Sequence, residues 1–391
     1  MHYDFETLVN RTGTGSSKWE GMKKHNPNIE RDIVPLSVAD MELKNAPEII
    51  EGLQDYLGDA ILGYTTETEG YLASVTSWME RRHNWKVDPQ WIVTAPGVVP
   101  ALGYAVQAFT KPGDGVIINR PVYYPFSMVV GMTGRKVVNN PLIHDEEKRS
   151  YTFDLEDLRQ KAADPANTLM ILCSPHNPVG RVWTMEELTR LNDLCSRYHV
   201  LVFSDEIHSD LIFPGHKHIP YQTVNQDAAG RSVTAMAPSK TFNIAGLKSS
   251  VLIIKNPELY SRVNKVVTAF HVGVDLFGLK AFEVAYRHGA AYVDELNQYL
   301  YENAQFVAEY VAENLPAAKT YVQDGTYLMW LDFTALGLSQ KELMEKVVGA
   351  GVAPNDGSHY GIEGNGFLRI NIGTQRAMLK EGLERLKTIF G

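Results

Sequence analysis

The sequence is poor in cysteine and has no long apolar run. Cys173 and Cys195 are the two cysteines among 391 residues, which predicts a fold without a disulfide framework and favours a reducing cytoplasm. No apolar stretch approaches the length of a membrane span. The acidic start, residues 1–6, lacks the basic and apolar regions of a signal peptide. These absences predict a cytoplasmic protein that makes no use of a membrane.

The sequence also lacks a block of basic residues. Its 37 Lys and Arg against 46 Asp and Glu give a net charge of −9 and a pI of about 5.8, so neither nucleic acid nor an anionic membrane is an expected partner. No internal repeat occurs, and no Gly-Lys dipeptide is present to form a P-loop. What the chain does have is a 44% hydrophobic fraction, enough for a large core and two or more domains.

Short apolar runs alternate with helical patterns through the middle of the chain. The candidate strands are 91–94, 115–118, 136–138, 168–173, 200–203, 232–236 and 250–254. The clearest helix starts at Thr184, which forms a capping box with Glu187 ahead of an apolar stripe. Alternation with short connections predicts an α/β fold with a mostly parallel sheet between helices.

The two ends of the chain have other patterns. A polar tract at 11–19 and a strand-like run at 33–40 predict an arm that wraps another part of the protein. Beyond Pro257 we expect helices through Leu315, then strands at 326–332 and 366–372, a helix capped by Ser339 and Glu342, and a last amphipathic helix. This pattern predicts an N-terminal arm (1–45) that joins the small domain, a large domain (46–285) and a smaller α/β C-terminal domain (286–391).

Lys240 gives the clearest chemical signal in the sequence. It follows the run 232–236 and has small, apolar or weakly polar neighbours, whereas a surface lysine usually sits among other charges. A desolvated amine has a lowered pKa and can condense with an aldehyde. An ordinary surface lysine is the alternative reading of this residue taken alone.

Two further predicted strands end in polar residues. The run 168–173 leads into Asn177, in Asn-Pro-Val-Gly, and the run 200–203 leads into Asp205. Open α/β sheets bind ligands at the carboxyl ends of their strands, so these side chains and Lys240 are expected at one edge. A Lys, an Asp and an Asn placed there suit pyridoxal phosphate chemistry. Alone, Asn-Pro-x-Gly is a turn, and Asp205-Glu206 could be a Walker B motif if a P-loop existed.

Six ordered motifs resemble the fold-type I, aspartate-aminotransferase-like family of pyridoxal-phosphate enzymes, and within it the bacterial cystathionine β-lyase (C–S lyase) subgroup. The motifs are Val38-Ala39-Asp40-Met41, Gly63-Tyr64-Thr65, Asn177-Pro178-Val179-Gly180, Ser204-Asp205-Glu206-Ile207-His208, Ser239-Lys240-Thr241-Phe242-Asn243 and Phe367-Leu368-Arg369-Ile370-Asn371. The resemblance implies the fold of type I pyridoxal-phosphate transferases, with a seven-stranded sheet in the large domain, and a homodimer with shared active sites.

The same resemblance implies roles for single residues. The catalytic residues would be Lys240, which holds the cofactor and takes the Cα proton, Asp205, which keeps the pyridine nitrogen protonated, and Tyr123, which stacks on the ring in preference to Tyr124. The further cofactor contacts would be Asn177 and His208 at the phenolic oxygen, and Gly97, Val98, Val99, Ser239, Lys248 and the partner-reaching Tyr64 at the phosphate. Substrate would be bound by Arg369, Ala39, Asn177 and Tyr64.

The sequence departs from the family pattern at Ala237, often Ser, at Lys248, often Arg, and at Ser37, often aromatic in this subgroup. The first two departures bear on the phosphate contacts and the third on the substrate pocket. His208 could instead be structural, or a metal ligand with His216 and His218. No cysteine or carboxylate cluster completes such a site, so no metal is expected.

The resemblance implies β-elimination on cystathionine or another cysteine S-conjugate, with a thiol, pyruvate and ammonia as products. An amino-acid aminotransferase is the nearer alternative, because it would use the same residues and return a proton to the cofactor. A regulatory protein that retains the cofactor site is the more distant one. The motifs alone do not separate lyase from aminotransferase.

Overall fold

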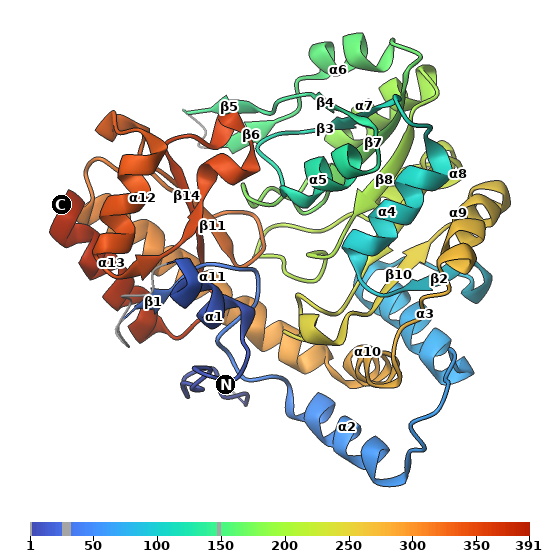
Figure 1. Cartoon of the computed structure of the whole chain (residues 1–391), viewed down its shortest axis with the longest axis horizontal. Coiled ribbons are helices and arrows are strands. Elements are labelled where there is room, and N and C mark those ends of the chain that lie inside the picture. The colour runs from blue at the N-terminus through green and yellow to red at the C-terminus, as the bar shows by residue number, and fades with distance from the viewer. Residues whose placement is uncertain (1, 26–32, 147–149) are drawn as a thin grey trace.

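The computed structural model describes residues 2–25, 33–146 and 150–391, and a seven-stranded sheet forms the centre of its larger part (Figure 1). The strand order is β2 (Ile92–Ala95), β10 (Ser250–Ile253), β9 (Ser232–Met236), β8 (Leu201–Asp205), β7 (Asn167–Cys173), β3 (Gly115–Ile118) and β4 (Lys136–Asn139). β10 runs antiparallel to both neighbours, and the other neighbouring pairs are parallel. The predicted seven strands and mostly parallel sheet are confirmed.

Helices bury both faces of this sheet, which is why its strands are continuous apolar runs. One face is covered by α4 (Val98–Phe109), α5 (Pro125–Met132) and α9 (Pro257–Phe270), and the other by α6 (Leu155–Ala162), α7 (Met185–Arg197) and α8 (Gln226–Gly230). α7 begins with the predicted capping box, in which Thr184 Oγ1 accepts from the Glu187 N–H at 3.2 Å and Glu187 accepts from the Thr184 N–H at 2.8 Å.

A second helical group lies beside the large sheet. α2 (Pro47–Asp59) and α3 (Glu69–His83) pack against α10 (Leu276–His288), and α2 extends away from the sheet at the lower edge of Figure 1. A loop at 60–68 without regular structure joins α2 to α3. α11 (Ala290–Asn314) then leads the chain to its C-terminal part.

The C-terminal part is built on a three-stranded antiparallel sheet in the order β11 (Leu328–Asp332), β14 (Phe367–Asn371) and β13 (Asn355–Asp356). α12 (Gln340–Gly349) has the predicted Ser339–Glu342 capping box, and α13 (Arg376–Phe390) buries the predicted Leu379, Leu383 and Leu386. β5 (Ile143–Asp145) and β6 (Ser150–Thr152) form a further two-stranded sheet, which contacts the C-terminal sheet through His144 and Phe367. The domain boundaries at 45 and 285 stay predictions.

The N-terminal arm lies against this C-terminal part (Figure 1). β1 (Val34–Pro35) pairs in parallel with β12 (Val352–Ala353), and α1 (Ser17–His25) precedes it. The predicted strand at 33–40 was too long, because Val38 takes the left-handed conformation (φ 56°) and turns the chain. The helix α1 begins within the polar tract at 11–19, and the sequence pattern did not predict this helix.

Both cysteines are buried and free. Within the described ranges, none of the helices combines the length and the apolar character needed to cross a lipid bilayer.

Candidate active site

A cavity of about 310 Å³ lies where β7, β8 and β9 end and α4 begins. The predicted residues that line it are Ala39, Gly97, Val98, Val99, Tyr123, Asn177, Asp205, His208, Ser239, Lys240 and Lys248. Parallel strands deliver their carboxyl-end residues to one edge, which is why segments far apart in sequence meet here. The sequence did not single out Pro96, Pro100, Cys173, Ile207, Ala245 and Ser249, which also line the cavity.

Lys240 points its amine at a backbone carbonyl. Nζ donates to the Ala39 oxygen at 2.7 Å. Burial, together with the charge of Arg369, lowers the pKa of Lys240 to about 8, against the opposing charges of Asp40 and Asp205. A larger fraction of the amine is therefore neutral near pH 7 than in an exposed lysine, as a nucleophile or a base requires.

Asp205 ends β8 and is 4% exposed. Its Oδ1 accepts from the Ile207 N–H at 3.2 Å. Burial raises the pKa of Asp205 to about 7, against the effects of that hydrogen bond and of the Lys240 charge. Among the described residues, none of the ion pairs joins this carboxylate to a cationic side chain. A buried carboxylate in that position favours a cationic ligand group beside it.

Two aromatic groups and an amide border the same cavity. Tyr123 lines it and is half-buried, whereas Tyr124 is exposed and is not among the lining residues. His208 is buried, and burial with the nearby cations lowers its pKa to about 3, so its ring is neutral. Asn177 uses its Oδ1 to accept from Arg369, so its amide NH₂ is the donor that remains for a ligand.

The start of α4 provides an anion-binding end to the cavity. Gly97 precedes the helix with φ 105° and ψ 157°, a conformation that L-residues rarely adopt, and the helix N–H groups follow it. Ser239 and Lys248 lie nearby, with Lys248 exposed and in the left-handed conformation. The Ser249 hydroxyl, which no sequence motif singled out, is buried and has no partner among the described residues.

Arg369 is buried behind the cavity lining. Its Nη1 donates to Asn177 Oδ1 at 3.0 Å and its Nη2 to Asn355 Oδ1 at 2.5 Å, and its guanidinium lies 5.1 Å from the centre of the Tyr360 ring. Its Nε has no partner among the described residues. Asn355 and Tyr360 are supporting residues that the motif did not reveal, because they lie apart from it in the sequence.

A second cavity, of about 760 Å³, shares Ala39, Lys240 and Ala245 with the first. The N-terminal arm contributes Arg11 and Ser16 to its wall, beside Asp40. Lys240 thus lies between a cavity of the large sheet and a cavity of the arm.

Three predicted features lie elsewhere. Tyr64 is fully exposed in the 60–68 loop and does not reach either cavity. Ser37 and Ala237 are buried and do not line the cavities. His216 and His218 do not meet His208, because they pair with Asp324 (3.6 Å) and Glu206 (2.8 Å). Among the described residues, no cluster of His, Cys, Asp and Glu could hold a metal ion.

The first cavity fits pyridoxal phosphate. Asp205 offers a buried carboxylate to a protonated ring nitrogen, Lys240 an amine to an aldehyde, and the start of α4 its N–H groups to a phosphate. The His208 Nδ1 atom, buried and without a partner among the described residues, is a further polar group for a ligand to satisfy.

The comparisons with known proteins agree with this geometry. The family model for aminotransferases of class I and II matches residues 31–386. The chain is 43% identical to cystathionine β-lyase PatB of Bacillus subtilis, over 98% of this chain and 99% of that protein. The structure is similar to that of cystalysin from Treponema denticola, which contains a pyridoxal 5′-phosphate cofactor, with a TM-score of 0.97 and 42% identity over 99% and 98% of the two chains. It is also similar to the pyridoxal-phosphate-bound C–S lyase from Staphylococcus hominis, with a TM-score of 0.92 and 29% identity over 100% and 98%.

Proposed function

The chain belongs to the class I and II aminotransferase family of pyridoxal-phosphate enzymes, and we propose that it is a C–S β-lyase acting on cystathionine or a related cysteine S-conjugate. The products would be a thiol, pyruvate and ammonia. The observation that carries the proposal is the amine of Lys240, with its pKa lowered to about 8, in a cavity that also holds Asp205. Such a site supports both β-elimination and transamination. The similar proteins are named as lyases, which favours β-elimination.

Bound cofactor supplies an aldehyde for the substrate amine and a ring that takes up the electrons left at Cα. The residues of the chain do the rest. Arg369 binds the substrate carboxylate, and Asp205 holds the proton on the ring nitrogen. The Lys240 Nζ takes the Cα proton and, as the Cβ–S bond breaks, returns a proton to the leaving sulfur. Water then hydrolyses the released three-carbon product to pyruvate and ammonia.

We further propose a cytoplasmic homodimer in which Tyr64 completes the partner's site. The observation in favour is the 60–68 loop, which exposes Ile61 (90%), Leu62 (64%) and Tyr64. Neighbouring apolar side chains exposed to this degree are typical of a surface that another chain covers.

The test is release of pyruvate and ammonia from L-cystathionine by purified, cofactor-loaded protein without an oxoacid. We expect equal amounts of both, and loss of both in Lys240→Ala. If turnover requires an oxoacid and yields no pyruvate, the protein is an aminotransferase instead. If neither pyruvate release nor oxoacid-dependent turnover is seen, and Lys240→Ala still binds a partner protein as wild type does, the regulatory alternative is favoured.

A further inference from the structure

A short segment near the end of the N-terminal arm, residues 38–43, contacts the amine of Lys240. The carbonyl oxygen of Ala39 accepts from Lys240 Nζ at 2.7 Å and from the Tyr327 hydroxyl at 3.0 Å. Ala39 and Lys240 also line both cavities. The position of this carbonyl oxygen therefore determines where the amine points.

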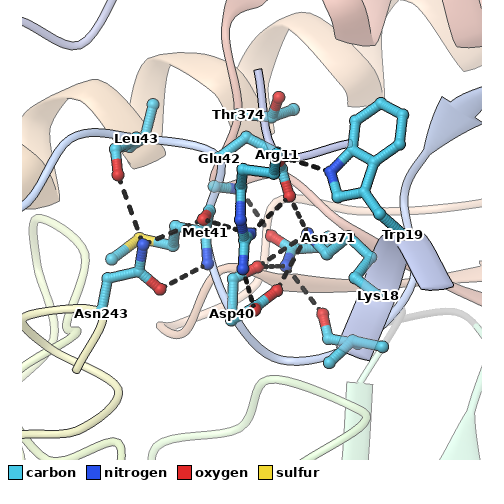
Figure 2. Close-up of polar contacts among 12 residues, drawn as sticks. Arg11, Lys18, Trp19, Asp40, Met41, Glu42, Leu43, Asn243, Asn371 and Thr374 are labelled. Carbon is cyan, nitrogen blue, oxygen red and sulfur yellow. Dashed lines mark hydrogen bonds and ion pairs between the residues drawn. The ribbon is translucent and has the colours of Figure 1, made fainter. Parts of the chain in front are cut away.

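The 38–43 segment has no helix or strand bonds. Hydrogen bonds from side chains in distant parts of the protein hold it in position instead. Asn371 donates to the carbonyl oxygens of Val38 (2.8 Å) and Asp40 (2.6 Å), and Asn243 accepts from the Met41 N–H at 2.8 Å (Figure 2). Val38 has a positive φ of 56°, which is rare for a β-branched residue and persists where the surroundings over-determine it. The conformation of the segment therefore depends on these contacts.

Lys18, on α1, is a buried residue that contacts the same segment, and the sequence did not predict this contact. Its side chain is 1% exposed, although lysine is among the residue types least often buried. Its Nζ donates to the carbonyl oxygen of Asp40 at 2.8 Å and lies 3.2 Å from Asp40 Oδ1 and 2.8 Å from Glu42 Oε1 (Figure 2). One of these contacts therefore holds the backbone directly after Ala39.

The charges around Lys18 are balanced. Arg11 pairs with Asp40 at 2.7 Å and with Glu42 at 2.9 Å, so two cations face two carboxylates. Trp19 adds a hydrogen bond from its Nε1 to Glu42 at 3.2 Å. Besides these ion pairs, Lys18 donates to the Asp40 carbonyl oxygen, a contact that balancing the charges does not require.

We propose that Lys18 is a positioning residue for Lys240. By holding the Asp40 carbonyl, it fixes the adjoining Ala39 peptide, whose oxygen orients the reactive amine. The inference rests on the proposed role of Lys240 as the base that takes the Cα proton. Lys18 Nζ contacts the carbonyl oxygen of Asp40, and the Lys240 amine contacts that of the adjoining Ala39, so Lys18 acts on the amine through the 38–43 segment.

The test uses holoenzyme of the double variant Lys18→Met with Glu42→Gln, which removes one charge of each sign and leaves Arg11 paired with Asp40. The measurements are the pH midpoint of the bound cofactor's absorbance change without substrate, the thermal midpoint, and kcat and KM for L-cystathionine. We expect the absorbance midpoint to fall by about one pH unit, because the carbonyl that favours a protonated amine is displaced. We expect kcat to fall by about tenfold or more with little change in KM.

Trp19→Phe is the matched control, since it removes a donor to the same Glu42 without touching the 38–43 backbone. It should lower thermal stability and leave the absorbance midpoint and kcat at wild-type values. If the double variant behaves like this control, Lys18 is a structural ion-pair partner and the proposal is wrong. If the double variant does not fold, Lys18→Arg, which replaces the compact ammonium by a planar fork, is judged by the same criteria. Wild-type protein that forms no pyruvate would overturn the proposed function, while the absorbance midpoints still decide on Lys18.

Discussion

Burial moves the pKa values of Lys240 and Asp205 in opposite directions, to about 8 and about 7. The two shifts have one cause, because removal from water disfavours the charged form of either group. A larger fraction of the amine is thereby neutral and able to take a proton near pH 7, and the carboxylate becomes more dependent on a cationic ligand group. These two residues give the site its chemistry before any ligand binds.

Asp205→Asn should test two consequences of the burial of Asp205, one for the stability of the cofactor-free protein and one for turnover. The pKa of Asp205 is about 7 in the folded protein, whereas the ordinary pKa of an aspartate is 3.8, so the folded state binds the proton more tightly than the unfolded chain does. The free energy of unfolding of cofactor-free wild type should therefore fall as the pH rises between these values, and the variant should lack this loss. Urea unfolding at about pH 5 and about pH 8 measures it, with the variant gaining on the order of a few kcal/mol at the higher pH.

In the loaded enzyme the same substitution should reduce pyruvate formation by about a hundredfold or more, because the ring nitrogen loses its anionic partner. An Asn variant that keeps wild-type turnover would contradict the role given to Asp205.

Arg369→Lys should act on substrate binding. Lysine cannot reproduce a bidentate pair with a carboxylate, so we expect KM for L-cystathionine to rise by about 10- to 100-fold with a smaller change in kcat. Arg181→Lys is the matched control, because Arg181 is a partly buried arginine paired with Glu187 and Asp324. If both variants raise KM alike, Arg369 does not bind the substrate.

The turn into α4 combines a conformational and a binding role. Gly97→Ala would put a side chain at φ 105°, although its Cβ would meet nothing closer than Pro100 at 3.8 Å. The backbone, and not a clash, should therefore lower the free energy of unfolding by about 1–3 kcal/mol. Displaced N–H groups at the helix start should also weaken pyridoxal phosphate binding, by about tenfold.

Gly103→Ala, in the interior of the same helix, is the control for this prediction. Its Cβ would lie 3.9 Å from Val129 and it has no positive φ, so the variant should be neutral or more stable by about 0.5–1 kcal/mol. Urea unfolding and a fluorescence titration with pyridoxal phosphate measure both variants. Equal cofactor affinity of Gly97→Ala and wild type would argue against a phosphate site at α4.

The large sheet could be predicted from the sequence because its buried strands are short apolar runs that include β-branched residues. Asn177, Asp205 and Lys240 follow the ends of three of these strands. The surroundings of Lys240 could not be predicted in the same way. Lys18 lies in a polar, glycine- and serine-containing tract that is typical of a surface segment, and its burial depends on Asp40 and Glu42 folding over it. Contacts of this kind leave no periodic signal, since each partner is a single polar residue from a different element.

A shared site across a dimer predicts complementation between two inactive variants. Lys240→Ala removes the amine of its own site, whereas Tyr64→Ala should impair the site of the partner. When the two variants are mixed and exchange subunits, they should form hybrid dimers. In each hybrid one site has both Lys240 and the partner's Tyr64, so activity returns. Sedimentation should show a dimer in each sample. A mixture that stays inactive despite exchange would mean that Tyr64 serves the site of its own chain.

The bonds from Asn371 to the 38–43 segment also bear on how the protein is made. Asn371 follows Val38 by 333 residues, yet its amide holds the Val38 carbonyl. Ribosomes build a chain from its amino end, and domains fold as they emerge. The large sheet can therefore form on the ribosome while the carbonyl that orients Lys240 still lacks its support. A nascent chain would remain inert through most of its translation, and the catalytic amine would find its orientation only as the last strands leave the exit tunnel.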